Sequence, residues 1–406
     1  MSFRAIPWLI AFTVTVVHLA GPDPAQAAGP LVLFGGRLRL GGEASGTVAP
    51  PDEGYFNFIA YDDYGDFVLR RFRASLSAEL RLGGHAAILG EIRSDNLRAP
   101  VVYALFLRVR PWAGKALDLQ AGIVPPVFGA FARRRYVWDN PLPGLPLVYQ
   151  YLTTLRADAV PASAEELLSM RGRGWEVGYS VGAPYQGPGV PQLHAEVWDT
   201  GVQVRIGARP VALAVSLTQG TLGHPLVGDN NDGKQLAGRL AWSPGPQLVV
   251  GVSASRGEFL ARRVTDSLPL QAGSGFDQSA LGADLEYARG YWIVRAEALW
   301  SRWRLPPLDA TRIETPQDSL GAFLEARYKL QPGLYLAGRV GRLSFSRLSS
   351  RSGGDTWDAG VTRLEIGAGY ALHRQVLLKT AWQYNWRDSS RFRSEGFIAA
   401  QVVLWF

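Results

Sequence analysis

Apolar and polar residues alternate along most of this 406-residue chain, and residues 70–82 show the pattern clearly. From Phe72 to Leu82 every even position is apolar, whereas the odd positions from Arg71 to Arg81 hold arginine, serine or glutamate. Successive side chains leave a β-strand on opposite sides, so this period of two predicts a strand with one apolar and one polar face. The apolar face would pack on a core in a soluble β-protein. In a membrane barrel it would face lipid, and the arginines would line a pore.

The same alternation predicts eighteen strands, most of them about ten residues long, the length that a tilted strand needs to cross a bilayer. The predicted strands lie at 31–40, 70–82, 86–95, 101–110, 116–124, 174–182, 191–199, 201–208, 211–219, 234–242, 247–256, 279–288, 291–301, 319–330, 333–344, 360–371, 375–387 and 396–406. Sixteen is the alternative number, because the pair at 191–208 has the weakest pattern. Both numbers are even, as in single-chain bacterial barrels, so we expect an all-β, transmembrane, antiparallel β-barrel.

The connections between the predicted strands alternate in length. Short turns such as "GGH", "ARP", "SPGP" and "QP" alternate with longer connections at 41–69, 125–173, 220–233, 257–278, 302–318 and 345–359. Two connections break the pattern, because "APYQGPGVP" is long for a turn and Asp199-Thr200 is tight for a loop. Membrane barrels have short periplasmic turns and long extracellular loops, whereas a β-sandwich has no reason to alternate in this way.

The first residues predict export. Arg4, an apolar run at 6–20 and the small-x-small motif Ala25-Gln26-Ala27 form a signal peptide at 1–27 that is removed after export. The apolar run is short for a membrane anchor and ends in Gly-Pro-Asp-Pro. No linker divides residues 28–406, so we expect a single barrel domain, and the absence of cysteine means that it contains no disulfide.

The last segment, "EGFIAAQVVLWF", alternates and ends on an apolar face with Phe406. It resembles the final strand of bacterial outer-membrane β-barrels, whose terminal phenylalanine is the signal read by the barrel-assembly machinery. The resemblance implies that Phe406 is the assembly signal. It also implies that the protein lies in the outer membrane of a Gram-negative cell, in contact with outer-membrane lipids.

The polar strand faces are rich in basic residues. On the predicted register the pore-lining basic residues include Arg37, Arg39, Arg71, Arg73, Arg81, Arg93, Arg108, Arg110, Lys379 and Arg387. The first two strands and the last but one concentrate Arg37, Arg39, Arg71, Arg73, Lys379 and Arg387 with only Glu79 nearby, so we expect a basic strip along one wall. Together with the formal net charge of +7, this favours small anionic solutes. The chain has no basic low-complexity tail, so we expect no nucleic-acid partner.

The connection at 125–173 is the longest and is rich in large apolar and aromatic residues, which disfavours disorder. We expect it to fold into the pore and narrow it, with Arg133, Arg134 and Arg135 as candidate constriction charges. The alternative is an external cap or an oligomer contact, in which these arginines would be solvated.

Two short motifs, "LDLQAGIVPPVFGAF" and the opening "GGRLRLGG", resemble the phosphate-selective porin family. In that family a strand that ends in a Pro-Phe-Gly-like turn leads into a large loop. The resemblance implies a trimeric barrel with an arginine-lined, anion-selective pore. In this chain Val127 separates Pro126 from Phe128-Gly129, and no phosphate-binding set can be matched residue by residue. The residues therefore predict a porin without naming phosphate as its solute.

Two other classes of function remain alternatives: an outer-membrane barrel enzyme of the lipase or protease type, and a barrel that serves as sheath or anchor for a partner protein. Ser180 lies in "GYSVG", which matches G-x-S-x-G, but it falls within a predicted strand with no helix after it. The mature histidines form no recognisable catalytic set, and "GDNNDG" lacks calcium-loop spacing. We therefore expect no catalytic residue, no metal and no cofactor, and we expect passive diffusion of small hydrophilic solutes.

Overall fold

The computed structural model describes residues 29–50, 69–112, 116–130, 136–231, 233–268, 275–306, 316–351, 353–389 and 394–406. The predicted signal peptide at 1–27 lies outside these described residues, and so do Arg133, Arg134 and Arg135.

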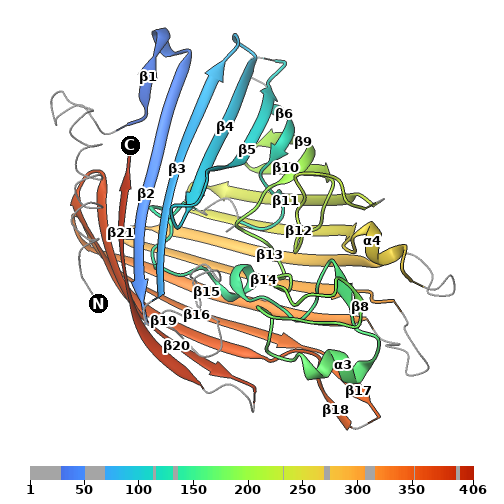
Figure 1. The fold of residues 1–406 in the computed structure, drawn as a ribbon. Helices are drawn as coiled ribbons and strands as arrows, with labels where there is room; N and C mark the ends of the chain where they lie inside the picture. The colour runs from blue at the N-terminus through green and yellow to red at the C-terminus, as the bar shows by residue number, and fades with distance from the viewer. Residues whose placement is uncertain are drawn as a thin grey trace.

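Sixteen antiparallel strands form a closed ring, in which β21 pairs with β2 (Figure 1). The ring consists of β2 (Leu38–Ala49), β3 (Leu69–Arg81), β4 (Ala86–Asp95), β5 (Val101–Val109), β6 (Leu117–Val124), β9 (Asp199–Ala208), β10 (Val211–Thr218), β11 (Gln235–Gly245), β12 (Leu248–Glu258), β13 (Asp277–Arg289), β14 (Trp292–Trp303), β15 (Gln317–Gln331), β16 (Leu334–Phe345), β19 (Val361–His373), β20 (Val376–Arg387) and β21 (Glu395–Trp405). The predicted all-β antiparallel barrel is confirmed.

The preferred count of eighteen strands is wrong, because residues 174–182 and most of 191–199 lie outside the ring. Val177 and Tyr179 alternate with exposed neighbours because they face the apolar core of the connection between β6 and β9. The backbone of this region pairs within the same connection, as in the bridge between Val177 and Gly187. The alternation at 174–182 therefore reflects packing against the connection's own core and not a position in the barrel wall.

The first barrel strand also differs from its predicted range, 31–40. Residues Leu31–Leu33 form a short strand, β1, which pairs with the beginning of β2 outside the ring. The chain reverses through the 3₁₀ turn η1 (Phe34–Gly36), where Phe34, Gly35 and Gly36 all have positive φ. Gly35 and Gly36 adopt their positive φ without steric cost, and β2 then continues to Ala49.

The two rims of the barrel carry connections of different length. One rim holds the turns between β3 and β4, β5 and β6, β9 and β10, β11 and β12, β13 and β14, β15 and β16, and β19 and β20, several of them only two residues long. The other rim holds the longer connections, including 125–198 between β6 and β9. Both exceptions to the predicted pattern disappear, because "APYQGPGVP" lies within this one long connection and Asp199-Thr200 is the beginning of β9 and not a loop.

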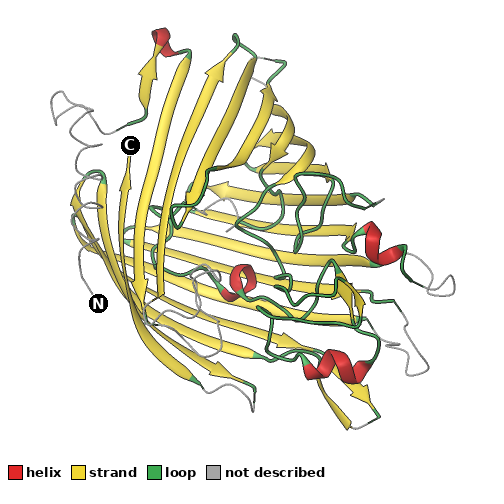
Figure 2. Cartoon of the chain, viewed as in Figure 1, coloured by secondary structure: helices red, strands yellow, loops and turns green. Residues whose placement is uncertain are grey.

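Short secondary-structure elements lie in the long connections (Figure 2). They are α2 (Leu147–Gln150), β7 (Ala159–Val160), α3 (Ala164–Ser169), β8 (Val181–Gly182), α4 (Arg262–Thr265), β17 (Arg347–Ser350) and β18 (Gly353–Thr356). No helix in the described part of the chain is long and apolar enough to span a membrane.

The outer face of the ring is apolar and the inner face is polar. On β3, Leu76 and Leu80 are 44% and 41% exposed, whereas Arg73 on the opposite face is 6% exposed. Exposed apolar side chains occur around the ring, among them Leu105, Val202, Leu213, Leu240, Val252, Leu281, Leu324, Val340, Ile366, Leu378 and Ile398. A continuous apolar surface of this extent is unstable in water and matches the lipid-facing band of a transmembrane barrel.

Phe406 closes the seam between the last strand and β2. Its backbone N–H donates to the Gly42 carbonyl oxygen at 3.0 Å, and the Gly42 N–H donates to the Phe406 carbonyl oxygen at 3.2 Å. The phenyl ring lies directly over Gly42, so a side chain at position 42 would collide with it; Cζ of the ring is 2.7 Å from where a Cβ would lie. Only glycine leaves room for the ring in this arrangement.

We predict that Gly42→Val and Phe406→Asp both reduce the yield of folded barrel strongly, because the first displaces the terminal ring from the seam and the second removes it. The matched control is Gly46→Val on the same strand and face, where a Cβ meets its nearest atom at an ordinary 3.6 Å. Heat-modifiability on gels measures the folded fraction. Normal yields from Gly42→Val, or equal losses from both valine variants, would contradict this account of the seam.

Candidate pore and its charged lining

The described parts of the connection at 125–198 run through the interior of the barrel (Figure 2). They contact opposite walls, at Glu297 of β14 and at Arg93 of β4. On the wall formed by β16 to β20, its backbone carbonyls accept hydrogen bonds from inward-facing cations. Lys379 Nζ donates to the carbonyl oxygens of Val137 at 2.8 Å and Asn140 at 2.9 Å. Arg339 donates to the Gly144 carbonyl oxygen at 2.9 Å. Predicted pore-lining Lys379 is therefore buried beneath the connection.

Apolar packing holds the middle of this connection against β13 to β15. Phe128, Val148 and Tyr149 form a buried cluster with Leu299 and Phe323 of the barrel wall. The Tyr149 hydroxyl also donates to the Glu297 carboxylate at 2.5 Å. A buried aromatic side chain with a satisfied hydroxyl is a stable anchor, so this part of the connection has a defined position in the lumen.

The end of the connection contacts the opposite wall through Glu196. Oε2 of Glu196 lies 2.5 Å from Nη2 of Arg73, 3.0 Å from Nη1 of Arg93 and 3.4 Å from Nη2 of Arg71. Burial alone would raise the pKa of Glu196, but these three arginines hold it well below its usual range. Glu196 is therefore ionised at neutral pH, and its ion pairs with the three arginines are lost only on strong acidification.

This arrangement corrects the expectation of an uncompensated basic strip with only Glu79 nearby. Asp95 accepts from Nε of Arg73 at 2.8 Å and lies 3.4 Å from Nε of Arg71. Near Lys379, Glu43 accepts from the Trp138 backbone N–H at 3.1 Å. The predicted basic residues Arg71, Arg73 and Lys379 do face inward on this wall, but acids from β2, β4 and the connection neutralise much of their charge.

Alternating charges also line the wall beneath the connection. Arg239 pairs with Asp284, Arg295 with Glu286 and Glu325, and Arg339 with Glu325 and Glu365. Buried carboxylates and guanidiniums need such partners, since an unpaired buried charge is costly. This middle zone of the lumen is thus close to electrically neutral.

The half of the lumen near the short turns has a different charge balance. Its inward-facing basic side chains are Arg39, Arg81, Arg108, Arg110, Arg205, Arg327 and Lys329, and its inward-facing acids are Glu79, Asp118 and Glu286. Arg81 and Arg110 remain 41% and 59% exposed although they contact Glu79 and Asp118. We call this region the basic vestibule. Arg37 lies at its rim, in the turn before β2, whereas Arg387 lies at the opposite rim beside Glu395.

Asp358 clamps the connection to the loop that precedes β19. Its carboxylate accepts from the backbone N–H groups of Thr154 at 3.0 Å, Gly172 at 2.8 Å and Ala359 at 2.7 Å, and from the Tyr151 hydroxyl at 3.1 Å. Burial raises the pKa of Asp358 to about 6, so it is ionised at pH 7.5. One side chain therefore satisfies donors from three separate stretches of chain.

We predict that Asp358→Ala speeds amide hydrogen exchange at Thr154 and Gly172 by about tenfold or more, because each buried donor left unsatisfied costs about 1–3 kcal/mol. The matched control is Asp355→Ala, in the same loop, whose side chain is 57% exposed and pairs with Arg171. Exchange measured by mass spectrometry on the folded barrel distinguishes the two. Equal exchange rates in both variants would show that Asp358 is not a clamp.

Sequence reasoning missed Asp95, Glu43 and Asp358. The turn at 82–85 pairs Arg73 directly with Asp95, so counting the hairpin register would have found that partner. Glu43 was missed because the first strand was expected to end at residue 40. Asp358 lies in a loop, and nothing local in the sequence indicates that its partners are about 200 residues away.

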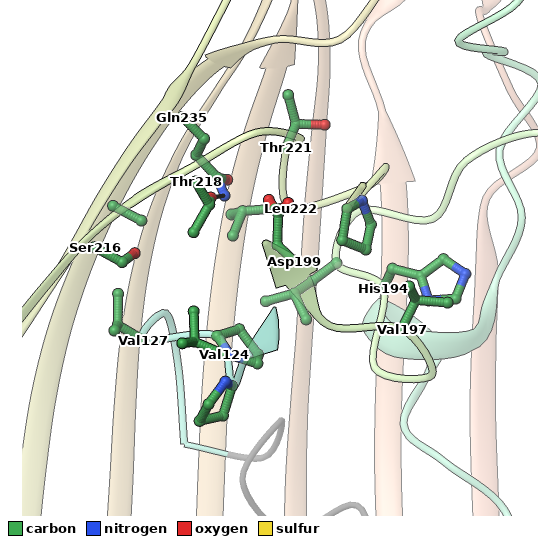
Figure 3. Close-up of a pocket in the computed structure, with 15 residues that line it drawn as sticks. Val124, Val127, His194, Val197, Asp199, Ser216, Thr218, Thr221, Leu222 and Gln235 are labelled. Carbon is green, nitrogen blue, oxygen red and sulfur yellow. Dashed lines mark hydrogen bonds between the residues drawn. The ribbon is translucent and has the colours of Figure 1, made fainter. Parts of the chain in front are cut away.

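A small cavity lies where the connection leaves β6 (Figure 3). Val124, Val127, His194, Thr218 and Gln235 are among the residues that line it, and its volume is about 20 Å³. That volume holds about one water molecule and is too small for a solute. Burial lowers the pKa of His194 to about 4, so the imidazole is neutral at physiological pH.

The described residues contain no cluster of three or more His, Cys, Asp or Glu side chains that could hold a metal ion. Ser180 donates from its hydroxyl to Glu166 at 2.7 Å in an exposed position near β8. It does not lie on the sharp strand-to-helix turn that the nucleophile motif requires.

Neither a family model nor a curated protein matches the sequence. Solved structures of outer-membrane barrels match the fold over nearly its whole length. The outer membrane channel DcaP of Acinetobacter baumannii is 12% identical with a TM-score of 0.54, covering 93% of this chain and 100% of that one. The anion-selective porin from Comamonas acidovorans is 12% identical with a TM-score of 0.51, covering 91% and 99%. OmpT, an outer membrane protein of Vibrio cholerae, is 10% identical with a TM-score of 0.53, covering 92% and 99%. At these identities the likeness establishes a porin-type barrel fold.

Proposed function

We propose that this protein is an outer-membrane porin for passive diffusion of small hydrophilic, preferentially anionic solutes. The observation that carries the proposal is the combination, in one closed ring, of an apolar outer face and the basic vestibule. An apolar exterior suits lipid, and a charged interior with exposed arginines suits water and ions. The similar solved structures include an anion-selective porin, which supports the same class of function.

The anion preference is proposed to arise in the basic vestibule. Arginine stays charged at every physiological pH, and the low-dielectric wall of a barrel focuses the field of fixed charges on passing ions. The vestibule contains more inward-facing basic than acidic side chains, whereas the zone beneath the connection is balanced. Small anions as a class are the proposed solutes, and the resemblance to phosphate-selective porins adds no particular ligand.

The connection at 125–198 is proposed to form the constriction. It crosses the lumen from Tyr149, which bonds to Glu297 on β14, to Glu196, which pairs with Arg73 on β3, and this leaves less room for solutes than the empty ring would. Arg133, Arg134 and Arg135 remain candidate constriction charges on this connection.

We further propose that the short turns face the periplasm and the long connections face the outside. The signal peptide at 1–27 would direct export, and the barrel-assembly machinery would recognise Phe406. A homotrimer is the proposed assembly; a trimer form is known for the similar OmpT of Vibrio cholerae.

Liposome swelling tests the proposal with solutes of matched size and opposite charge. Liposomes that contain the folded protein should swell faster in a small carboxylate than in an ammonium compound of equal size, and should not swell in a large oligosaccharide. Equal swelling rates in the anionic and the cationic solute would contradict the proposed anion preference. No swelling in any solute would favour a plugged barrel that serves as an enzyme or an anchor.

A further inference from the structure

Three arginines from adjacent strands converge on one oxygen atom of the interior connection. Arg71 and Arg73 project from β3 and Arg93 from β4, and all three lie within 3.4 Å of Oε2 of Glu196. A planar guanidinium presents several fixed donors that fit a carboxylate or a phosphate. Three such groups around one oxygen are the arrangement that recognises a free oxyanion, and here a side chain of the same chain fills it.

The cluster lies near the mouth of the barrel at its long-loop rim. Asp95 ends β4, and its pairing with Arg73 is the last in the register between β3 and β4. The connection that follows, 96–100, is short for this rim, so little chain extends beyond the ends of β4 and β5 here. Glu196 and Asp95 keep 27% and 33% of their side-chain surface exposed. Both of these carboxylates are therefore open to water.

The backbone around Glu196 is fixed independently of its carboxylate. The Tyr103 hydroxyl donates to the Ala195 carbonyl oxygen at 3.0 Å, and the Trp198 ring packs against Tyr103 with 5.1 Å between centroids. Arg93 is also held, with its guanidinium carbon 3.6 Å from the centroid of the Tyr103 ring. Removal of the carboxylate should therefore leave both the backbone and the arginine site in place.

We propose that Arg71, Arg73 and Arg93 form a binding site for the carboxylate or phosphate group of a permeating solute, and that Glu196 occupies this site as a tethered ligand which the solute displaces. The inference rests on the proposed function and names the chemical group that the channel recognises at its mouth. Three cations face Glu196, Asp95 and Glu91 in this cluster, so displacement of Glu196 leaves a net positive site for an anion.

A tethered side chain competes at an effective concentration in the millimolar range or above. Solutes should therefore bind weakly to the natural protein and exchange rapidly, as transport requires. Without the tethered carboxylate the same site should hold a free anion for longer.

The test is titration calorimetry on the detergent-solubilised full mature chain with succinate and, separately, with inorganic phosphate. Glu196→Ala should bind at least one of these about tenfold more tightly than the natural protein. Glu176→Ala is the matched control, because it removes another acid of the same connection, one that pairs with Arg173 at 3.5 Å and not with the cluster. The control should leave affinity unchanged, and adding Arg93→Gln to Glu196→Ala should abolish the gain.

Unchanged affinity in a folded, heat-modifiable Glu196→Ala barrel would overturn the proposal, as would an equal gain in Glu176→Ala. If Glu196→Ala fails to fold, Glu196→Gln gives the same charge change with the side-chain size kept, and the same criteria apply. Calorimetry needs no conducting pore, so a protein that binds anions but prefers cations in flux measurements would contradict the proposed function and leave this site intact.

Discussion

Replacement of residues 136–192 by a flexible linker of about ten Gly and Ser residues is expected to raise the single-channel conductance several-fold in 1 M KCl. These residues include the lumen-crossing part that Lys379, Arg339 and Tyr149 hold against the wall. Conductance rises with the cross-section of the aqueous path, and the remaining ring would have sixteen strands with no segment across it. The high salt suppresses charge effects, because the screening length is about 3 Å at 1 M.

The control for this deletion shortens an exposed feature at the same rim. Removal of residues 350–353 trims the hairpin between β17 and β18, which lies outside the ring, and should change conductance little. The replacement of residues 136–192 also exposes Trp303 and Trp357, because both pack in the apolar cluster formed with the connection. Both variants must therefore first pass the heat-modifiability test. An unchanged conductance after the large deletion would favour a cap that does not limit flow.

Reversal of charge in the basic vestibule is expected to change the sign of the ion selectivity. The triple variant Arg39→Glu, Arg81→Glu and Arg110→Glu adds three carboxylates beside Glu79 and Asp118, which then lose cationic neighbours. In a tenfold KCl gradient at low ionic strength, the reversal potential should move from the anion side to the cation side, within the limit of about 59 mV set by perfect selectivity. The shift should shrink in concentrated salt.

Single variants and an outward-facing control locate this effect. Arg81→Glu alone should shift the reversal potential in the same direction by a smaller amount. Arg302→Glu makes the same charge change on the outer face near the long-loop rim, where Arg302 pairs with Asp318, and should have almost no effect. A comparable shift from Arg302→Glu would mean that the selectivity does not arise in the vestibule.

The barrel class was predictable because the lipid-facing wall imposes a local rule. Each wall residue faces either lipid or lumen, so period two appears within single segments, as in the predicted strand 70–82 and the observed β3 at Leu69–Arg81. The same rule misled at 174–182, where Val177 and Tyr179 face a core built from the connection itself. Alternation shows that one side is apolar and does not show what covers it.

The charge pattern was only partly predictable. Alternation places Arg71, Arg73, Arg81 and Arg108 on the inner face, as the register shows. Their partners depend on contacts between segments far apart in the sequence: Glu196 reaches Arg73 across more than 120 residues. The expected basic strip is thus neutralised near the mouth. The remaining excess of positive charge lies nearer the short turns, at positions that only the strand register identifies.

The central claim is that this barrel conducts small ions through its lumen, and the most direct test is single-channel recording of the natural mature chain in planar bilayers. The folded protein should insert in discrete current steps that are linear with voltage, with a reversal potential on the anion side in a dilute KCl gradient. A folded, heat-modifiable protein that inserts without current steps would contradict the account, since its lumen would then be closed to ions.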